Sequence, residues 1–396
     1  MLPDKANIMT DNLQNLALKD FRRQRRTILT IFFALTLFGM LMIYESSSMH
    51  AFKTTSDAAY FFKRQAVFFL IGLSMFYFTL FWDLEFLKRY NKEFLIFTIL
   101  LLLAVLIFGR KGGGAKRWFS IFGFSIQPSE LLKISFLLYC ADFYQRKKGL
   151  LRSVVLGLFP LGIVLGIICF LLLLQPDLGT AVFWVAWVIL FLYLFGARQK
   201  HLIIVMSLGL VAAIILIKMY PYRLSRIIAY INPFADPKGA GFQLIQSQIA
   251  YGIGGIKGVG FGEGLQKLSF LPAAHTDFVF SIVAEEFGLF GSLGLLAVFF
   301  VAFHKMFKIA NYSSDKFRKA ILWGVVLIFF LEVVINIGVS CGLLPTKGLP
   351  LPFMSYGGSS LVVHYILLGL FFNASRPTGR QNLLERGDID EDSTGM

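Results

Sequence analysis

The chain has 396 residues, of which 57% are hydrophobic and only 15% are charged, whereas a soluble domain carries about 25% charged residues. Its formal net charge of +15 would suit a nucleic-acid-binding protein, but no soluble basic domain accompanies the apolar sequence, and basic loops are common in membrane proteins. The composition excludes a soluble globular enzyme and predicts a membrane protein that binds no nucleic acid.

Cysteine and histidine give no sign of a disulfide or metal framework. Cys140, Cys169 and Cys341 all lie in apolar runs, and an odd number of buried thiols argues against a disulfide or zinc site. The five histidines are scattered without metal-ligand spacing. We therefore expect no metal site built from these residues.

The polar first 27 residues end in a basic run at 22–26 and precede an apolar stretch without a convincing small-residue cleavage site. This pattern favours a signal anchor over a removed signal peptide. About 20 apolar residues let a helix cross a bilayer, and ten runs approach that length. They lie near 28–44, 66–82, 94–108, 128–145, 153–174, 179–195, 202–219, 278–303, 320–342 and 356–373.

These runs predict an all-α polytopic membrane protein with about ten transmembrane helices. Lys and Arg are more frequent in the segments that face the cytoplasm if the N-terminus is inside, which predicts that both termini are cytoplasmic. The expected units are a basic cytoplasmic segment (1–27), a membrane domain (28–375) and a disordered cytoplasmic tail (376–396).

Two segments are neither helical spans nor short loops. Residues 109–127 contain three consecutive glycines, and residues 220–277 form a glycine-rich extracytoplasmic loop between the seventh and eighth helices. Long structured loops are usually functional. The glycines of the second segment indicate either helix breaks and flexibility or close approach to a sugar-phosphate ligand.

Charged residues at membrane depth are costly and require a reason. Glu130 and Lys133 lie three residues apart in the first turns of the fourth span, so they can pair on one helix face. The pair either holds the bundle together or presents a cation to a phosphate group. Arg117 and Trp118 lie just outside this helix and suit either an interfacial anchor or a substrate site.

Two aspartates precede helices. Asp177 follows Pro176 at the start of the sixth span and suits an N-cap. Asp277 lies at the outer mouth of the eighth span, where it is either an N-cap or a site carboxylate, and Glu286 follows inside that span.

The ninth span and the segment after it carry a second polar feature. Glu332, Asn336 and Ser340 recur every four residues, which predicts a polar seam inside the bundle. The Pro- and Gly-broken segments 345–348 and 350–360 resemble a re-entrant element, which is stable only when it is buried in protein or lines a cavity.

Four ordered motifs together resemble the SEDS family (shape, elongation, division and sporulation), over about residues 28–375. Within that family the segments 232–237, 266–268 and 344–348 look like the division branch, FtsW, or its sporulation relative SpoVE, more than the elongation branch, RodA. The family usually has Glu where this chain has Ala273. The four motifs are Gln127–Glu130, Gln175–Thr180, His275–Phe278 and Ser355–Ser360.

The resemblance implies polymerisation of lipid II at the outer face of the bacterial cytoplasmic membrane, with the division septum as the expected location. It also implies a class B penicillin-binding protein (an FtsI-type transpeptidase) and other divisome proteins as partners, and it leaves a Mg or Mn ion open as a cofactor. A positioned base must deprotonate the attacking sugar hydroxyl, and cations must stabilise the leaving diphosphate.

Asp277 is the candidate base. The expected substrate-binding residues are Arg117, Trp118, Glu130, Lys133, Lys347, Ser355 and Ser359, and the further candidates are Lys116, Lys267, His275, Asp177 and Glu286.

Three other functions fit parts of the pattern. A lipid II flippase or transporter would use the same bundle and broken helices, but it needs no base at the outer surface. A scaffold that recruits a transpeptidase has no use for Lys133 inside the bilayer. An elongation-type, RodA-like polymerase shares the chemistry but not the cell-division role.

Overall fold

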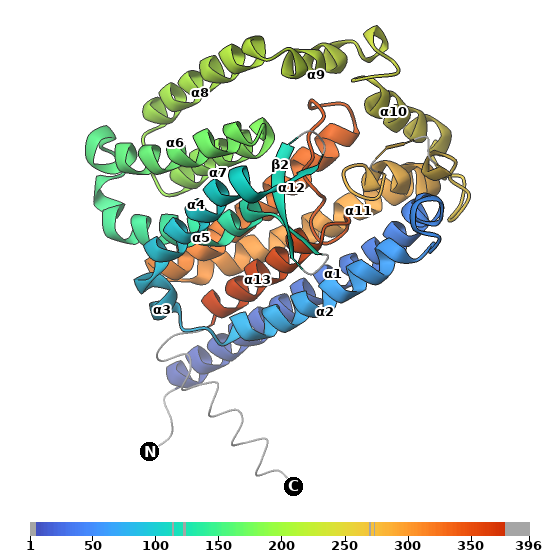
Figure 1. Ribbon diagram of the computed structural model, residues 1–396. Helices are drawn as coiled ribbons and strands as arrows, with labels where there is room; N and C mark the ends of the chain where they lie inside the picture. Colours follow the sequence, from blue (N-terminus) through green and yellow to red (C-terminus); the bar gives the residue numbers. More distant parts are fainter. Residues whose placement is uncertain (1–4, 113–114, 122–123, 269–270, 273, 377–396) are drawn as a thin grey trace.

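The computed structural model describes residues 5–112, 115–121, 124–268, 271–272 and 274–376. Within them each of the ten predicted apolar runs forms a helix, which confirms the all-α polytopic architecture (Figure 1). The ten helices are α1 (Lys5–Thr55), α2 (Tyr60–Leu80), α4 (Asn91–Phe108), α5 (Pro128–Lys147), α6 (Phe159–Leu174), α7 (Leu178–Leu194), α8 (Gln199–Met219), α11 (Val279–Tyr312), α12 (Lys316–Ser340) and α13 (Gly358–Ala374).

Length and hydropathy separate these helices into groups. In the described part of the chain, seven helices are long and apolar enough to cross a membrane, and α7 and α13 are shorter apolar helices. α5 is less apolar, because it buries Glu130, Lys133 and Asp142 among its hydrophobic residues. Short elements connect the spans: α3 (Leu84–Arg89), η1 (Lys148–Leu150), the single π turn η2 (Val154–Leu158), α9 (Pro221–Ile231), η3 (Pro233–Ala235), α10 (Phe242–Gly254) and η4 (Gln266–Leu268).

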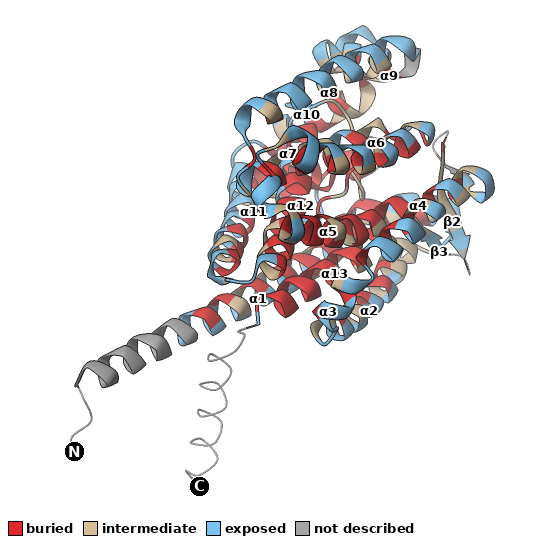
Figure 2. Cartoon of the chain, turned by 90° about the vertical axis from the view of Figure 1, so that its left-hand side faces the viewer, coloured by how far each residue is buried: buried red, intermediate tan, exposed pale blue. Residues whose placement is uncertain are grey.

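The most buried helices form the centre of the bundle. α5 packs against α4, α12 and α13, and α13 also packs along α2. Figure 2 shows α5, α12 and α13 largely buried, whereas α8 and α9 are exposed at the periphery. α8 contacts α7 and α9 and buries only Leu202, so its apolar side chains suit contact with lipid.

The described residues between 110 and 126 form a small antiparallel sheet. Its strands are β1 (Arg110–Gly112), β2 (Ala115–Ile121) and β3 (Phe124–Ile126), in that spatial order. Lys111 pairs with Lys116, and Ser120 pairs with Ser125. β2 packs on α4 and α5, while β3 reaches α13, so the sheet lies over one end of the central helices.

The glycine-rich part of the long loop fills a break in α11. Gly288 has φ 64° and ψ −159°, which interrupts the helix. The freed backbone groups bond to the loop: Leu289 N donates to Gly255 O at 2.9 Å, and Gly260 N donates to Glu286 O at 3.0 Å. A break at membrane depth is stable only when the protein satisfies its backbone. At Gly258 and Gly288 the absence of side chains lets the backbone of the loop lie close to the backbone of α11.

We predict that Gly288→Ala destabilises the fold by about 1–3 kcal/mol, because its backbone region is nearly restricted to glycine. An added Cβ would also lie 2.6 Å from Ile256 O and closer still to Gly258 N. Thermal unfolding in detergent measures the effect. Gly294→Ala is the matched control, since open space surrounds that position in the same helix. An equal melting temperature for both variants would contradict the role of the break.

Candidate active site

The non-helical segments that carry Asp277 and Lys347 meet near the first turn of α7. A Cβ placed on Gly348 would lie 3.3 Å from Oδ2 of Asp277, so this carboxylate lies over the backbone next to Lys347. A Cβ on Gly179 would lie 2.8 Å from Cγ of Lys347. The lysine stem therefore crosses the first turn of α7, and the structure brings together the segments of Asp277 and Lys347, which were predicted separately from the sequence.

The site aspartates have different local roles. Asp177 caps α7, because its Oδ1 accepts from Thr180 N at 3.1 Å and its Oδ2 accepts from the Thr180 hydroxyl at 3.0 Å. Its predicted N-cap role is confirmed. Asp277 makes no cap: the N-cap position of α11 is Phe278, without a side-chain hydrogen bond. The N-cap alternative for Asp277 is therefore wrong.

Two arginines contact the same segments. Arg117 on β2 donates from Nε to Gln175 O at 2.9 Å and from Nη2 to Pro176 O, which fixes the turn before α7. Arg226 on α9 donates to Thr346 O at 3.3 Å and attracts the carboxylate of Asp277. Arg226 was not among the predicted site residues, although the Lys and Arg residues of the segment 220–277 pointed to an anionic ligand there.

Burial shifts the protonation of both central groups. It raises the pKa of Asp277 to about 6, although Arg226 and a hydrogen bond with the Thr276 side chain oppose the shift. Burial lowers the pKa of Lys347 to about 8, although the negative charge of Asp177 opposes it. Desolvation thus brings the pKa of the Asp277 carboxylate and the pKa of the Lys347 ammonium closer to neutral pH, the range that suits acid–base and electrostatic catalysis.

Lys133 lies in a buried ion cluster of the bundle. Its ammonium is 2.6 Å from Glu130 Oε2 and 2.5 Å from Glu332 Oε1, and His364 Nε2 is 2.9 Å from Glu332 Oε2. The predicted pair with Glu130 is confirmed. Lys133 is buried in protein, and its charge is compensated by two carboxylates. A direct contact of Glu130 or Lys133 with substrate stays a prediction.

A second buried cluster contains Lys267 and Glu286. The Lys267 ammonium contacts Glu45 and lies 2.9 Å from Glu286 Oε1, and it donates to Gly262 O at 2.6 Å. The cluster joins α1, the glycine-rich loop and α11. These two candidates thus hold the C-terminal half of α1 against the loop through Glu45, which was not among the predicted site residues.

The remaining candidates surround the site with local structural contacts. Ser355 Oγ accepts from Leu351 N at 2.9 Å, and Ser359 Oγ donates to Ser125 O at 3.2 Å. Lys116 is hydrogen-bonded to Ile107 O. Trp118 pairs with Arg110 between β1 and β2.

His275 packs in an aromatic group next to the site. Its ring lies 4.7 Å from the Phe61 ring and 6.3 Å from the His50 ring, and its carbonyl accepts from Tyr356 N at 2.8 Å. Burial, with a smaller effect of His50, lowers the pKa of His275 to about 4, so it is neutral at physiological pH. Ala273, where a second acid was expected from the resemblance, lies outside the described residues.

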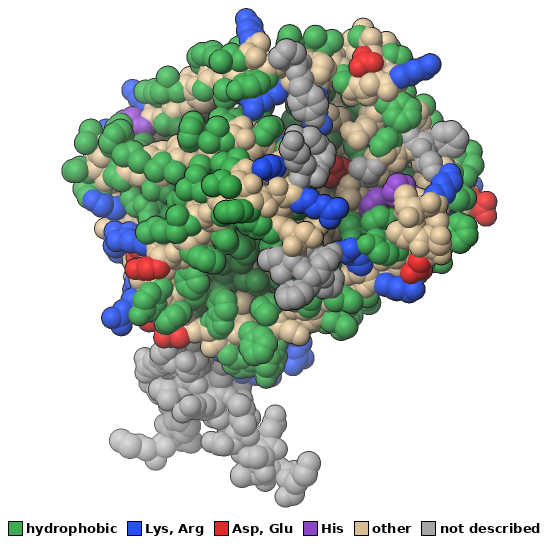
Figure 3. All heavy atoms as spheres, in the orientation of Figure 1, with side chains coloured by type: hydrophobic (Ala, Val, Ile, Leu, Met, Phe, Trp, Pro, Cys, Tyr) green, Lys and Arg blue, Asp and Glu red, His purple; other side chains and the backbone are tan. Residues whose placement is uncertain are grey.

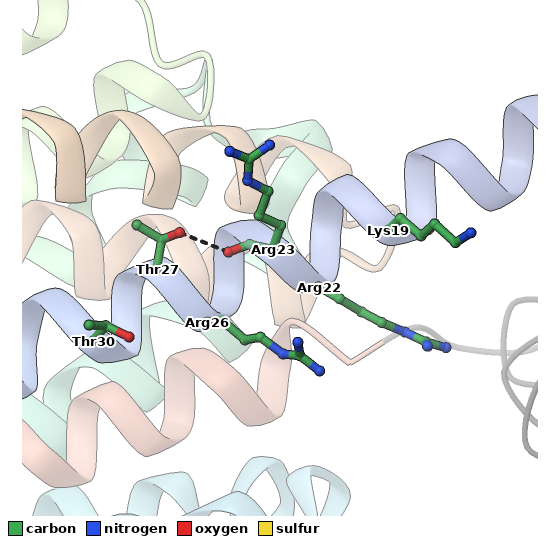
Figure 4. Close-up of a pocket in the computed structure, with 6 residues that line it drawn as sticks. All are labelled: Lys19, Arg22, Arg23, Arg26, Thr27 and Thr30. Atoms are coloured by element: carbon green, nitrogen blue, oxygen red, sulfur yellow. Dashed lines mark hydrogen bonds between the residues drawn. The ribbon is translucent and has the colours of Figure 1, made fainter.

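One face of the molecule carries both hydrophobic and basic side chains. Figure 3 shows hydrophobic side chains over much of one face and Lys and Arg side chains around a hollowed region near its centre. A separate basic pocket of about 460 Å³ lies on α1 near the N-terminus (Figure 4). It is lined by Lys19, Arg22, Arg23, Arg26, Thr27 and Thr30.

The model of the cell cycle protein family of FtsW, RodA and SpoVE matches residues 25–379. The chain belongs to this family. A probable peptidoglycan glycosyltransferase FtsW of Trichlorobacter lovleyi is 41% identical over 88% of this chain and 92% of that protein. The Geobacter metallireducens protein of the same name is 40% identical, over 91% and 96%. Stage V sporulation protein E of Bacillus subtilis is 37% identical, over 85% and 93%.

Solved structures support the family fold. A chain from a study of polymerisation and crosslinking by a peptidoglycan synthase complex superposes with a TM-score of 0.72 at 30% identity. It covers 88% of this chain and 96% of its own length. The rod-shape-determining protein RodA of Thermus thermophilus gives 0.66 at 26% identity, over 88% and 95%. The fold is thus that of the FtsW/RodA/SpoVE family.

We predict that Lys133→Met destabilises the protein by about 3–5 kcal/mol, because it leaves two buried carboxylates without their cation. Thermal unfolding in detergent measures the loss. Adding Glu332→Gln to Lys133→Met should recover part of it. Lys116→Met, at the partly exposed Lys116 of β2, is the matched control and should change stability little. A Lys133→Met variant as stable as this control would exclude a structural role for the ion cluster.

Proposed function

We propose that this chain is a peptidoglycan glycosyltransferase that polymerises lipid II into glycan strands during cell division. The observation that carries the proposal is the desolvated carboxylate of Asp277, which lies over Gly348, the residue after Lys347, and is attracted by Arg226. The family membership and the names of the relatives point to the same chemistry.

Asp277 acts as the general base in the proposed reaction. A sugar hydroxyl of one lipid II unit attacks the anomeric carbon of another, and its proton passes to the Asp277 carboxylate. The new glycosidic C–O bond forms as the bond to the lipid diphosphate breaks, and the diphosphate leaves with the electron pair. A pKa of about 6 keeps Asp277 ionised at neutral pH yet basic enough to accept the proton.

The cations stabilise the negative charge that grows on the diphosphate. Arg226 attracts the carboxylate of Asp277, the side chain of Lys347 extends over Gly179, and Arg117 contacts the turn before α7 through two carbonyl groups. A diphosphate is a good leaving group, so one carboxylate suffices and no general acid is required. Alanine at position 273 is compatible with this mechanism.

The proposed orientation places Asp277 outside and both termini in the cytoplasm. The basic pocket on α1 supports this, because Lys and Arg accumulate on the cytoplasmic side of membrane helices. Asp277 then lies where the headgroups of lipid II arrive in the outer leaflet. We further propose the septum as the location in the cell.

A class B penicillin-binding protein is the proposed partner, and other divisome proteins are expected around it. The structural similarity to a chain from a peptidoglycan synthase complex supports this assignment. The described residues hold no group of three or more His, Cys, Asp or Glu side chains placed to bind a metal. The proposed mechanism uses the chain's own cations, and a Mg or Mn ion stays open as a cofactor.

Labelled lipid II and purified protein with its transpeptidase partner separate the candidate functions. Glycan polymer on a gel supports the proposal, whereas transbilayer movement of lipid II without polymer would indicate a flippase. A purified complex that produces neither would indicate a scaffold.

We predict that Asp277→Asn lowers polymerisation by roughly 10²–10⁴-fold, the usual contribution of a general base, while expression and partner binding stay normal. Polymerisation assays measure the loss. Asp315→Asn is the matched control: Asp315 caps α12 through Arg318 N at 2.8 Å, and Asn caps a helix as well as Asp. Near-normal glycan synthesis by Asp277→Asn would refute the base assignment.

We predict a bell-shaped pH dependence of kcat/KM. The acidic limb should lie near pH 6, below which Asp277 is protonated, and the alkaline limb near pH 8, above which Lys347 loses its charge. Initial polymerisation rates across neutral pH measure both limbs. Because a guanidinium stays charged, Lys347→Arg should move only the alkaline limb to higher pH. An unchanged alkaline limb in this variant would remove Lys347 from the reaction.

A further inference from the structure

Asn336 joins two of the segments that build the site. It lies on α12 with only 1% of its surface exposed. Its side-chain Nδ2 donates to Asp277 O at 3.0 Å and to Leu349 O at 2.8 Å. One amide group therefore binds the residue that carries the carboxylate and a residue two positions after Lys347.

These bonds set the spacing of the reacting groups. Leu349 N also donates to Lys347 O at 3.0 Å, so the turn that carries the lysine is closed on itself and anchored by Asn336. The carboxylate of Asp277 lies over Gly348, the residue between Lys347 and Leu349. Neither segment is helical at these positions. Hydrogen bonds from the Asn336 side chain therefore pair backbone carbonyl groups that a helix would otherwise pair.

We propose that Asn336 is a positioning residue that holds the general base and the phosphate-binding lysine in register. The inference rests on the proposed function. Both partners are carbonyl oxygens, which only accept hydrogen bonds, so the residue must supply two donors from one rigid group. An amide NH2 does this, whereas a carboxylate cannot donate and a hydroxyl donates once.

A second asparagine separates positioning from mere stabilisation. Asn373 on α13 is also buried, and its Nδ2 donates to Thr79 O at 2.9 Å and to Trp82 O at 2.7 Å. It thus joins two backbone carbonyls with the same chemistry as Asn336. Its partners lie at the end of α2 and carry none of the reacting groups, so Asn373→Leu is a matched control.

The test compares Asn336→Leu and Asn373→Leu in the full-length protein with its transpeptidase partner. Melting temperatures measure stability, and initial polymerisation rates on lipid II give kcat and KM separately. Both variants should lose stability. Only Asn336→Leu should lower kcat, by up to roughly 10²-fold, the cost of a small misplacement of catalytic groups. Its KM should change little, because the base contributes to the transition state more than to substrate binding.

A second variant covers the case in which Asn336→Leu does not fold. Asn336→Ser keeps one donor and should give a kcat between those of wild type and Asp277→Asn. A kcat of Asn336→Leu equal to that of Asn373→Leu would overturn the inference, as would a wild-type kcat for Asn336→Ser. Absence of polymer from the wild-type complex would instead refute the proposed function.

Discussion

The site depends on one constraint: a carboxylate and an ammonium are withdrawn from water without neutralising each other in a closed ion pair. The carboxylate of Asp277 lies over Gly348, the residue after Lys347, and burial moves the pKa of Asp277 and of Lys347 toward neutrality. In a closed pair the carboxylate pKa would fall and the lysine pKa would rise. In the proposed mechanism the diphosphate of a substrate interacts with the cations and a sugar hydroxyl of a second substrate meets the base.

The surrounding bundle supports this arrangement with buried ion pairs. The buried cation Lys133 has two carboxylate partners, and Lys267 likewise contacts two, as charges removed from water require. The break in α11 is filled by the glycine-rich loop. Lys133 and Lys267 are thus compensated by protein carboxylates and hold helices together, whereas Asp277 and Lys347 are the groups that we propose for the reaction.

Much of this organisation follows from the sequence. Apolar run length locates the ten helices, and the cap at Asp177 and the pair of Glu130 with Lys133 follow from local spacing. Contacts between distant segments do not, because no periodicity encodes them. The sequence identifies Glu332 as part of a polar seam but not as a partner of Lys133. Arg226 and Asn336 join the site only through the folding of α9 and of the segment after α12. The sequence of the glycine-rich loop indicates either helix breaks and flexibility or a ligand. Its hydrogen bonds to the break in α11 at Gly288 become visible only in the structure.

The most direct test of the account is a structure of the Asp277→Asn protein, with its transpeptidase partner, bound to lipid II. The account predicts that the diphosphate lies within hydrogen-bond distance of Lys347 and Arg226. It also predicts that a sugar hydroxyl of a second lipid II faces the side chain at position 277. A headgroup bound instead at the basic pocket on α1, or one whose sugars do not reach position 277, would contradict it.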